Sequence, residues 1–299
     1  MKNVGVRAVV FILLALVVDA VAVHPAEAVI PAPPEFGRLF RVSKTGVPDS
    51  FVLGTLHAAA PRVDSLAPPL LAALAKSRTL AVEMVPEERD GQMLELEQLE
   101  NGQRLQPLIG TAAYAEVRER LVALSMPESS IERLKPWAAM MRVARTAGAS
   151  SPTLDEEILT AARKSRMKIL PLELLEEQIS AFDTIPTETQ VALLQHALLQ
   201  REVLQANAAA TAEAWLRGDL DALFRVASNN DGRFPPMTRH YTALIEHIIY
   251  GRTALMHHRL FVPLREGRVL VAIGALHLQG PKGLLALLRQ DGYRVTPVW

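Results

Sequence analysis

The stretch that decides the fold occurs twice, as FVLGTLH at residues 51–57 and as VAIGALH at residues 271–277. In each copy an apolar run typical of a buried β-strand ends in Gly-x-x-His. A short proline-containing loop, an apolar helix-like segment and a second apolar run then follow. We therefore predict two similar strand–GxxH–helix–strand units in one sheet. Because glycine tolerates positive φ, Gly54 and Gly274 are expected to let the chain turn sharply away from the strand.

The histidines that close these motifs, His57 and His277, are the first candidate functional residues. Ligands bind at the carboxyl ends of strands in open α/β sheets, so both imidazoles are expected to reach one crevice. Two imidazoles placed in this way could bind one metal ion or act on one substrate. The alternative is a pair of buried histidines that only hold loops by hydrogen bonds.

The rest of the chain predicts the elements around these units. A β-hairpin is expected over 39–54 around KTGVPD, and a buried strand that carries Glu83 is expected over 79–85. A short strand is expected at 168–172, and Thr153 and Glu156 have the spacing of a helix capping box. Helices are expected over 67–77, 93–105, 114–124, 131–146, 188–217, 219–227 and 238–260. We therefore predict one α/β domain over residues 29–299, with a mixed sheet, pseudo-twofold symmetry and a large helical insertion at about 90–260.

The composition excludes several function classes. The 299 residues include 32 acidic and 32 basic side chains, and a formal net charge of zero argues against nucleic acid as a partner. The absence of cysteine excludes disulfides, thiolate metal sites and cysteine nucleophiles. Any metal site must therefore use histidine, carboxylate or water. Signatures of serine hydrolases, nucleotide-binding loops and HExxH metalloproteases are absent from the sequence.

The first 28 residues have the pattern of a bacterial signal peptide. Lys2 and Arg7 precede an apolar run at 8–18, and the small-residue sequence AEA at 26–28 fits a cleavage site. The apolar run is too short for a comfortable membrane span. We expect a mature chain that starts near Val29 in the periplasm or outside the cell, with no stable membrane span. An uncleaved membrane anchor is the alternative.

Three charged residues are further candidates. Glu83 lies in the apolar stretch LAVEM, where a charge is costly unless it is paired or bound to a metal. Glu173 follows the strand expected at 168–172, and it could equally open the next helix from the surface. Arg252 precedes the second GxxH strand and would be an ordinary surface arginine by pattern alone. Beside carboxylates and a metal it would instead stabilise an oxyanion. Four more histidines are expected to be mostly solvated: His240, His247, His257 and His258.

Several motifs together resemble the TraB/GumN family, which includes the Tiki proteins. The motifs that carry the resemblance are LGTLH at 53–57, AVEM at 81–84, LKPWAA at 134–139, LELLEEQ at 172–178, AWLRGD at 214–219 and AIGALHLQGPKGLLALLRQDGYRVTPV at 272–298. The resemblance covers nearly the whole chain after the signal peptide. It implies a fold related to erythromycin-esterase-like and ChaN-like proteins, with both GxxH loops at one cleft.

Tiki proteins are regarded as metal-dependent proteases, so the resemblance implies a metal-dependent, peptidase-like hydrolase. It implies His57, His277 and Glu83 as ligands of a divalent ion, and these ligand types suit Mn²⁺, Co²⁺ or Zn²⁺. Glu83 would be a ligand or the general base, and Arg252 would stabilise the oxyanion.

This chain departs from the family pattern at one position of the expected site. The family often has asparagine after this arginine, where this chain has Thr253, so the effect of this residue on the ligand geometry is open. The substrate, whether a peptide or a polysaccharide-related molecule, also stays open. The alternative function is a non-catalytic periplasmic protein of the same fold that binds a metal, haem or a glycan.

Overall fold

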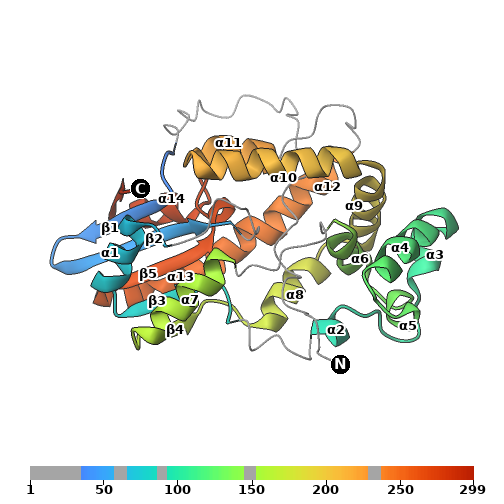
Figure 1. Ribbon diagram of the computed structural model, residues 1–299, viewed down its shortest axis with the longest axis horizontal. Helices are drawn as coiled ribbons and strands as arrows, with labels where there is room; N and C mark the ends of the chain where they lie inside the picture. The colour runs from blue at the N-terminus through green and yellow to red at the C-terminus, as the bar shows by residue number, and fades with distance from the viewer. Residues whose placement is uncertain (1–34, 57–65, 86–92, 145–152, 228–236) are drawn as a thin grey trace.

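The computed structural model describes residues 35–56, 66–85, 93–144, 153–227 and 237–299 (Figure 1). The described part is built on a six-stranded mixed sheet with the strand order β4-β3-β5-β2-β1-β6. The strands are β1 (Leu39–Lys44), β2 (Val47–Thr55), β3 (Thr79–Val82), β4 (Lys168–Pro171), β5 (Val269–Gly274) and β6 (Arg294–Pro297). The pairs β2–β5, β5–β3 and β3–β4 are parallel, and β1 runs antiparallel to β2 and β6. This arrangement confirms the predicted α/β class, the hairpin and the mixed sheet.

The two GxxH strands are direct neighbours in the centre of the sheet. β2 pairs with β5 in parallel, and Gly54 lies opposite Ile273 while Thr55 lies opposite Gly274. The two motifs are therefore displaced from one another by one residue. All six residues of β5 are buried, as expected for a parallel strand covered on both faces. Both strands end at the same edge of the sheet.

Helices cover both faces of this sheet. α1 (Pro68–Lys76) connects β2 to β3, and α14 (Leu284–Gln290) connects β5 to β6 in the opposite direction along the sheet. Right-handed crossovers that run in opposite directions place their helices on opposite faces. Figure 1 shows α1 and α7 (Leu154–Lys164) in front of the strands. α13 (Arg252–Glu266) packs against α14 and β2.

The predicted pseudo-symmetry is only approximate. β3 lies two positions from β2 in the sheet, whereas β6 lies three positions from β5. The difference arises because the hairpin strand β1 is inserted between β2 and β6.

A second hydrophobic core lies among the helices of the middle of the chain, apart from the core around the sheet. The remaining elements are α2 (Met93–Leu96), α3 (Leu105–Ile109), α4 (Thr111–Ala123), α5 (Glu128–Ile131), α6 (Pro136–Val143), α8 (Leu175–Asp183), α9 (Thr187–Leu199), α10 (Arg201–Leu216), α11 (Leu220–Ala227), α12 (Thr238–Ile245), a π-helical segment (Glu246–Gly251) and a 3₁₀ turn (Ala275–His277). The range predicted as an insertion, about 90–260, also contains α7 and β4, which belong to the sheet and its covering layer.

Several predicted element boundaries are wrong. The helix expected over 93–105 stops at Leu96, and Asn101 and Gly102 adopt positive φ values of 54° and 74° that no α-helix contains. The helix expected over 131–146 begins only at Pro136, because proline lacks the N–H that an internal helical position must donate. The long helix expected over 188–217 is broken at Gln200 into α9 and α10.

The capping box at the start of α7 is confirmed. The Glu156 amide donates to Thr153 Oγ1 at 3.3 Å, and the Thr153 amide donates to Glu156 Oε2 at 2.9 Å. The first-turn acidic residues Asp155, Glu156 and Glu157 also favour the positive end of the helix dipole.

Neither GxxH glycine adopts the positive φ for which glycine was expected at these positions. Gly274 has φ −52°, and Gly54 is not among the residues with positive φ. A Cβ on Gly54 would instead lie 2.8 Å from Leu278 Cδ1 and 2.9 Å from Ala275 Cβ. Gly54 is therefore needed because the turn after β5 packs directly on β2. Its carbonyl accepts a hydrogen bond from Trp215 Nε1 at 2.8 Å.

Replacing Gly54 by alanine should lower the free energy of unfolding by about 1–3 kcal/mol, since the methyl group overpacks a rigid contact. The measurement is urea unfolding followed by circular dichroism. Gly251→Ala is the matched control, because its Cβ would meet only Glu246 O, at 3.4 Å. Equal stability of the two variants would contradict the packing role of Gly54.

Candidate active site

Candidate residues gather where the parallel strands end. Glu83 directly follows β3, Glu173 lies two residues after β4, and His277 lies three residues after β5. Their side chains are buried, as is that of Arg252, with exposed fractions of 4%, 1%, 3% and 6%. His57, the predicted partner of His277 at the end of β2, lies outside the described residues. The strand predicted over 79–85 ends at Val82, so Glu83 begins the loop and is not a strand residue.

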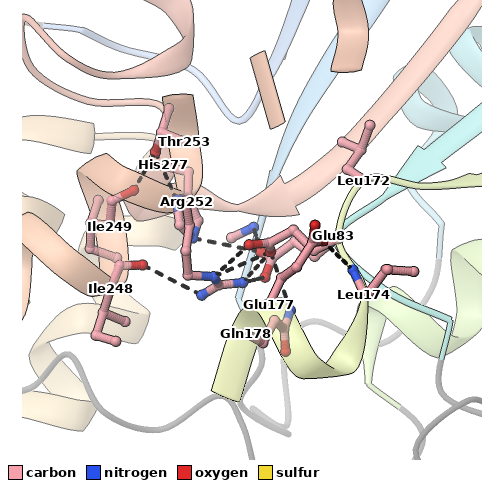
Figure 2. Close-up of polar contacts among 12 residues, drawn as sticks. Glu83, Leu172, Leu174, Glu177, Gln178, Ile248, Ile249, Arg252, Thr253 and His277 are labelled. Carbon is pink, nitrogen blue, oxygen red and sulfur yellow. Dashed lines mark hydrogen bonds and ion pairs between the residues drawn. The ribbon is translucent and has the colours of Figure 1, made fainter. Parts of the chain in front are cut away.

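Arg252 bridges the two carboxylates (Figure 2). Its Nη2 lies 2.7 Å from Glu83 Oε2 and 2.6 Å from Glu173 Oε2, and its Nε donates to Glu173 Oε1 at 3.0 Å. The interpretation of Arg252 as a surface residue is therefore wrong. The surface interpretation of Glu173 is wrong as well, since its carboxylate is buried against the guanidinium. The backbone keeps the two carboxylates adjacent, because the Glu173 amide donates to Glu83 O at 2.8 Å.

The electrostatics of this cluster are dominated by burial. Burial raises the pKa of Glu173 above its usual value, although the positive charge of Arg252 opposes the shift. Burial by itself lowers the pKa of Arg252, but the two carboxylates outweigh this effect, and the net shift is upward. The guanidinium therefore stays charged. With both carboxylates ionised, the trio of Glu83, Glu173 and Arg252 carries a formal charge of −1. A proton or a cation would compensate this charge.

Glu83 also faces the second GxxH motif. Its Oε1 accepts a hydrogen bond from the Gly274 amide at 2.6 Å and lies 3.9 Å from His277 Nε2. The amide of Gly274 thus fixes the carboxylate beside the imidazole. This contact ties the end of β5 to the end of β3.

Thr253 sets the tautomer of His277. Thr253 Oγ1 donates its only proton to Ile249 O at 2.7 Å, so it accepts the hydrogen bond from His277 Nδ1 at 2.8 Å. In the neutral imidazole the proton therefore lies on Nδ1, and Nε2 presents a lone pair toward Glu83. The hydroxyl of Thr253 consequently orients the histidine.

The donor chemistry of the site fits a divalent cation. His277 Nε2 and Glu83 Oε1 are two adjacent ligand atoms of the types that borderline metal ions prefer. The hydrogen bond from Nδ1 to Thr253 is the second-shell contact that metal-bound histidines usually have. Within the described ranges, no group of three or more His, Asp or Glu side chains could hold a metal ion. A third protein ligand would have to come from elsewhere, and the predicted one is His57.

Two supporting features were not predicted from sequence. Gln178 is fully buried, and its Nε2 donates to Glu173 Oε2 at 3.3 Å. The π-helical segment Glu246–Gly251 directly precedes Arg252 and Thr253, and both side chains reach back to its carbonyls. Segments of π-helix occur frequently at functional sites. The apolar periodicity of this region does not distinguish a π-helix from an α-helix, so the sequence held no signal for the π-helical segment. Gln178 could have been suspected, because it ends the motif LELLEEQ at 172–178.

An open groove of about 570 Å³ reaches this cluster from the surface. It lies between α8 and the π-helical segment, and Glu173 and Arg252 are among its lining residues. His247 lines the groove, whereas His257 pairs with Asp291 and His258 is exposed. His240 was expected to be solvated, but it is buried against Thr189, with Nδ1 2.9 Å from the hydroxyl.

A comparison with protein families places the chain in relation to known proteins. The family model described as the TraB/PrgY/gumN family matches residues 38–297, which is nearly the whole described chain. Comparisons with curated proteins and with solved structures found no match.

Proposed function

The chain belongs to the TraB/PrgY/gumN family, and we propose that its strand-end cluster is the active site of a metal-dependent hydrolase acting on peptide bonds. The observation that carries the proposal is the buried Glu83–Arg252–Glu173 trio with His277 Nε2 directed at Glu83. Peptide bonds are the substrate class that the resemblance to Tiki proteins implies. The open groove beside the cluster gives a substrate a route to it.

The residues of the cluster would have separate roles in binding the ion and in moving a proton. His277 Nε2 and Glu83 Oε1 would hold the ion, with His57 as the predicted third ligand. The bound ion would supply Lewis-acid activation of water and of the scissile carbonyl. Glu83 would hold a water molecule or take its proton, and the Gly274 amide keeps that carboxylate in place. Thr253 keeps the proton of His277 on Nδ1, so that Nε2 carries the lone pair with which a neutral histidine binds a metal ion.

Most N–H groups of Arg252 already donate hydrogen bonds within the cluster, so few are left to stabilise an oxyanion. Its Nε and Nη2 are engaged by the two carboxylates, and among the described residues its Nη1 makes only a 3.5 Å contact with Ile248 O. Nη1 is therefore the atom that would donate to the carbonyl oxygen of a substrate. The first role of Arg252 is to balance the two buried carboxylates.

The test is a peptide-library digest read by mass spectrometry, with Mn²⁺, Co²⁺ or Zn²⁺ added and with a chelator control. Cleavage should require the metal, and calorimetry should find about one ion per chain, as for a single site. His277→Ala should weaken metal binding, whereas His258→Ala, an exposed histidine on α13, should not. Unchanged metal binding in His277→Ala would overturn the proposal. Tight retention of a metal, haem or a glycan without any cleavage would support the binding protein instead.

We also propose a periplasmic or secreted location, supported by the signal-like pattern at residues 1–28, which lies outside the described residues. In the part of the chain that is described, no helix has the length and apolar character to cross a membrane. N-terminal sequencing of protein from an osmotic-shock fraction should begin near Val29. Protein recovered only from the cytosol, with Lys2 retained, would contradict this location.

A further inference from the structure

The groove beside the cluster is lined by groups that receive hydrogen bonds or attract cations. One turn of the π-helical segment contributes Glu246, His247 and Tyr250, and α8 contributes Glu177 from the opposite wall. The lining contains three carboxylates in all, Glu173, Glu177 and Glu246, and two cationic side chains, Arg252 and Lys282. Both carboxylate oxygens of Glu177 already accept hydrogen bonds from Arg259, so the acceptors available to a ligand lie on the π-helical side, at Glu246 and His247.

His247 is held as a hydrogen-bond acceptor. Thr184 Oγ1 donates to Ala181 O at 3.0 Å, so it accepts from His247 Nδ1, which is also 3.0 Å away. The proton of the neutral imidazole therefore lies on Nδ1, and Nε2 is left as an acceptor. The arrangement repeats the one between Thr253 and His277, on the outer side of Arg252.

The groove already contains an ammonium group, that of Lys282. Its Nζ pairs with Glu246 Oε1 and lies 5.3 Å from the centroid of the Tyr250 ring. A carboxylate beside an aromatic face is the usual environment of a bound alkylammonium. Tyr250 is fixed by stacking on Phe224, with ring centroids 6.4 Å apart. The Lys282 side chain is 58% exposed, and exposed ion pairs of this kind are weak enough to exchange partners.

The same features disfavour an anionic ligand. The face of Tyr250 repels negative charge, and neither Glu246 nor the Nε2 lone pair of His247 can donate a hydrogen bond. An anion would therefore depend on Arg252 and Lys282, which already pair with carboxylates. Arg252 gives a second, independent indication of a peptide. It is 6% exposed and lines the groove, and within the part of the chain that the structure describes its Nη1 has only the long contact with Ile248 O. Nη1 can donate to a backbone carbonyl while a side chain of the same peptide extends toward Glu246.

We propose that this groove receives a lysine or arginine side chain of the peptide substrate, held by Glu246 and the Tyr250 ring in the place that Lys282 otherwise takes. The inference rests on the proposed hydrolase function for the meaning of the word substrate, but the binding itself is independent of turnover. Lys282 competes with the ligand for Glu246, so its departure accompanies binding.

The test is a binding measurement on the full chain in the presence of a chelator, so that cleavage does not interfere. Fluorescein-labelled peptides alternate glycine with lysine, norleucine or glutamate, and anisotropy reports their affinity. The lysine peptide should bind about 3–10-fold more tightly than the norleucine peptide, as expected for one partly exposed carboxylate and one aromatic face. The glutamate peptide should bind most weakly. High salt should reduce the preference.

Variants localise the effect. Glu246→Gln should remove the lysine preference, and Lys282→Met should increase the affinity for the lysine peptide by removing the competitor. Tyr250→Leu should weaken binding, whereas Tyr250→Phe, which keeps the ring, should not. The matched control is Glu188→Gln, since Glu188 is an exposed partner of Arg239 on other helices. Thermal unfolding confirms that each variant is folded.

The outcomes separate the two proposals. Equal affinity for lysine and norleucine peptides, tighter binding of the glutamate peptide, or an unchanged preference in Glu246→Gln would each overturn the groove assignment. Lysine binding through Glu246 without cleavage under any metal would leave the groove assignment standing and count against the hydrolase. Metal-dependent cleavage that shows no preference for basic residues would overturn the groove assignment alone.

Discussion

Replacing Glu83 by glutamine should lower the turnover of the metal-loaded protein by about 10²–10⁴-fold, the usual contribution of a general base. Glutamine has the shape of glutamate but cannot take a proton from water. Its single amide oxygen can satisfy either the Gly274 amide or Arg252, but not both, whereas the carboxylate satisfies both. The remaining pair of Arg252 and Glu173 is electrically neutral. The loss of stability should therefore be only about 1–3 kcal/mol, the penalty of one unpaired buried donor.

Glu97→Gln is the matched control for this result. Glu97 is also fully buried and also pairs with an arginine, Arg142, but it lies outside the strand-end cluster. The control variant should lose stability without losing turnover. Mass-spectrometric initial rates give the turnover, and urea unfolding gives the stability. Equal turnover of Glu83→Gln and the parent would remove Glu83 from the chemistry.

Replacing Arg252 by methionine should lower the free energy of unfolding by about 3–5 kcal/mol, because it leaves buried carboxylates without their counter-charge. Adding Glu173→Gln should recover part of this loss, since one of the two carboxylates is then neutral. Arg259→Met is the control: Arg259 also lies on α13 and pairs with Glu177 on α8, but both side chains are about one-third exposed. This control should lose about 0–1 kcal/mol.

The effect of Arg252→Met should depend on pH. The pKa of Glu173 is already raised from 4.5 in the intact site, mainly by burial. A raised pKa means that the folded state holds the proton more tightly than the unfolded chain does. The contribution of Glu173 to the free energy of unfolding is therefore fully present below about pH 4.5 and is lost as the pH rises through the folded pKa. Without Arg252 this loss should be larger, so the gap between variant and parent should narrow in acid. A gap that is constant from acid to neutral pH would contradict the account.

The local sequence was sufficient to predict the strands that carry the site. Parallel strands buried on both faces need continuous apolar runs, and the runs that end at Gly54 and Gly274 are of this type. The capping box at Thr153 is equally local, since its two partners are three residues apart. Glu83 could be singled out because a charge in an apolar run is expensive unless it is paired. Helix ends were predicted less well where an internal proline or a positive φ decided them.

Arg252 shows what only the tertiary structure decided. Its partners Glu83 and Glu173 are 169 and 79 residues away along the chain, so no local pattern distinguishes it from a surface arginine. The same holds for the hydrogen bond that orients His277 and for the close contact that requires Gly54. Burial, charge pairing and tautomer depend on which groups the sheet brings within hydrogen-bond distance. The sequence by itself determined which residue follows each strand, and the order of the strands in the sheet decided which of those residues meet.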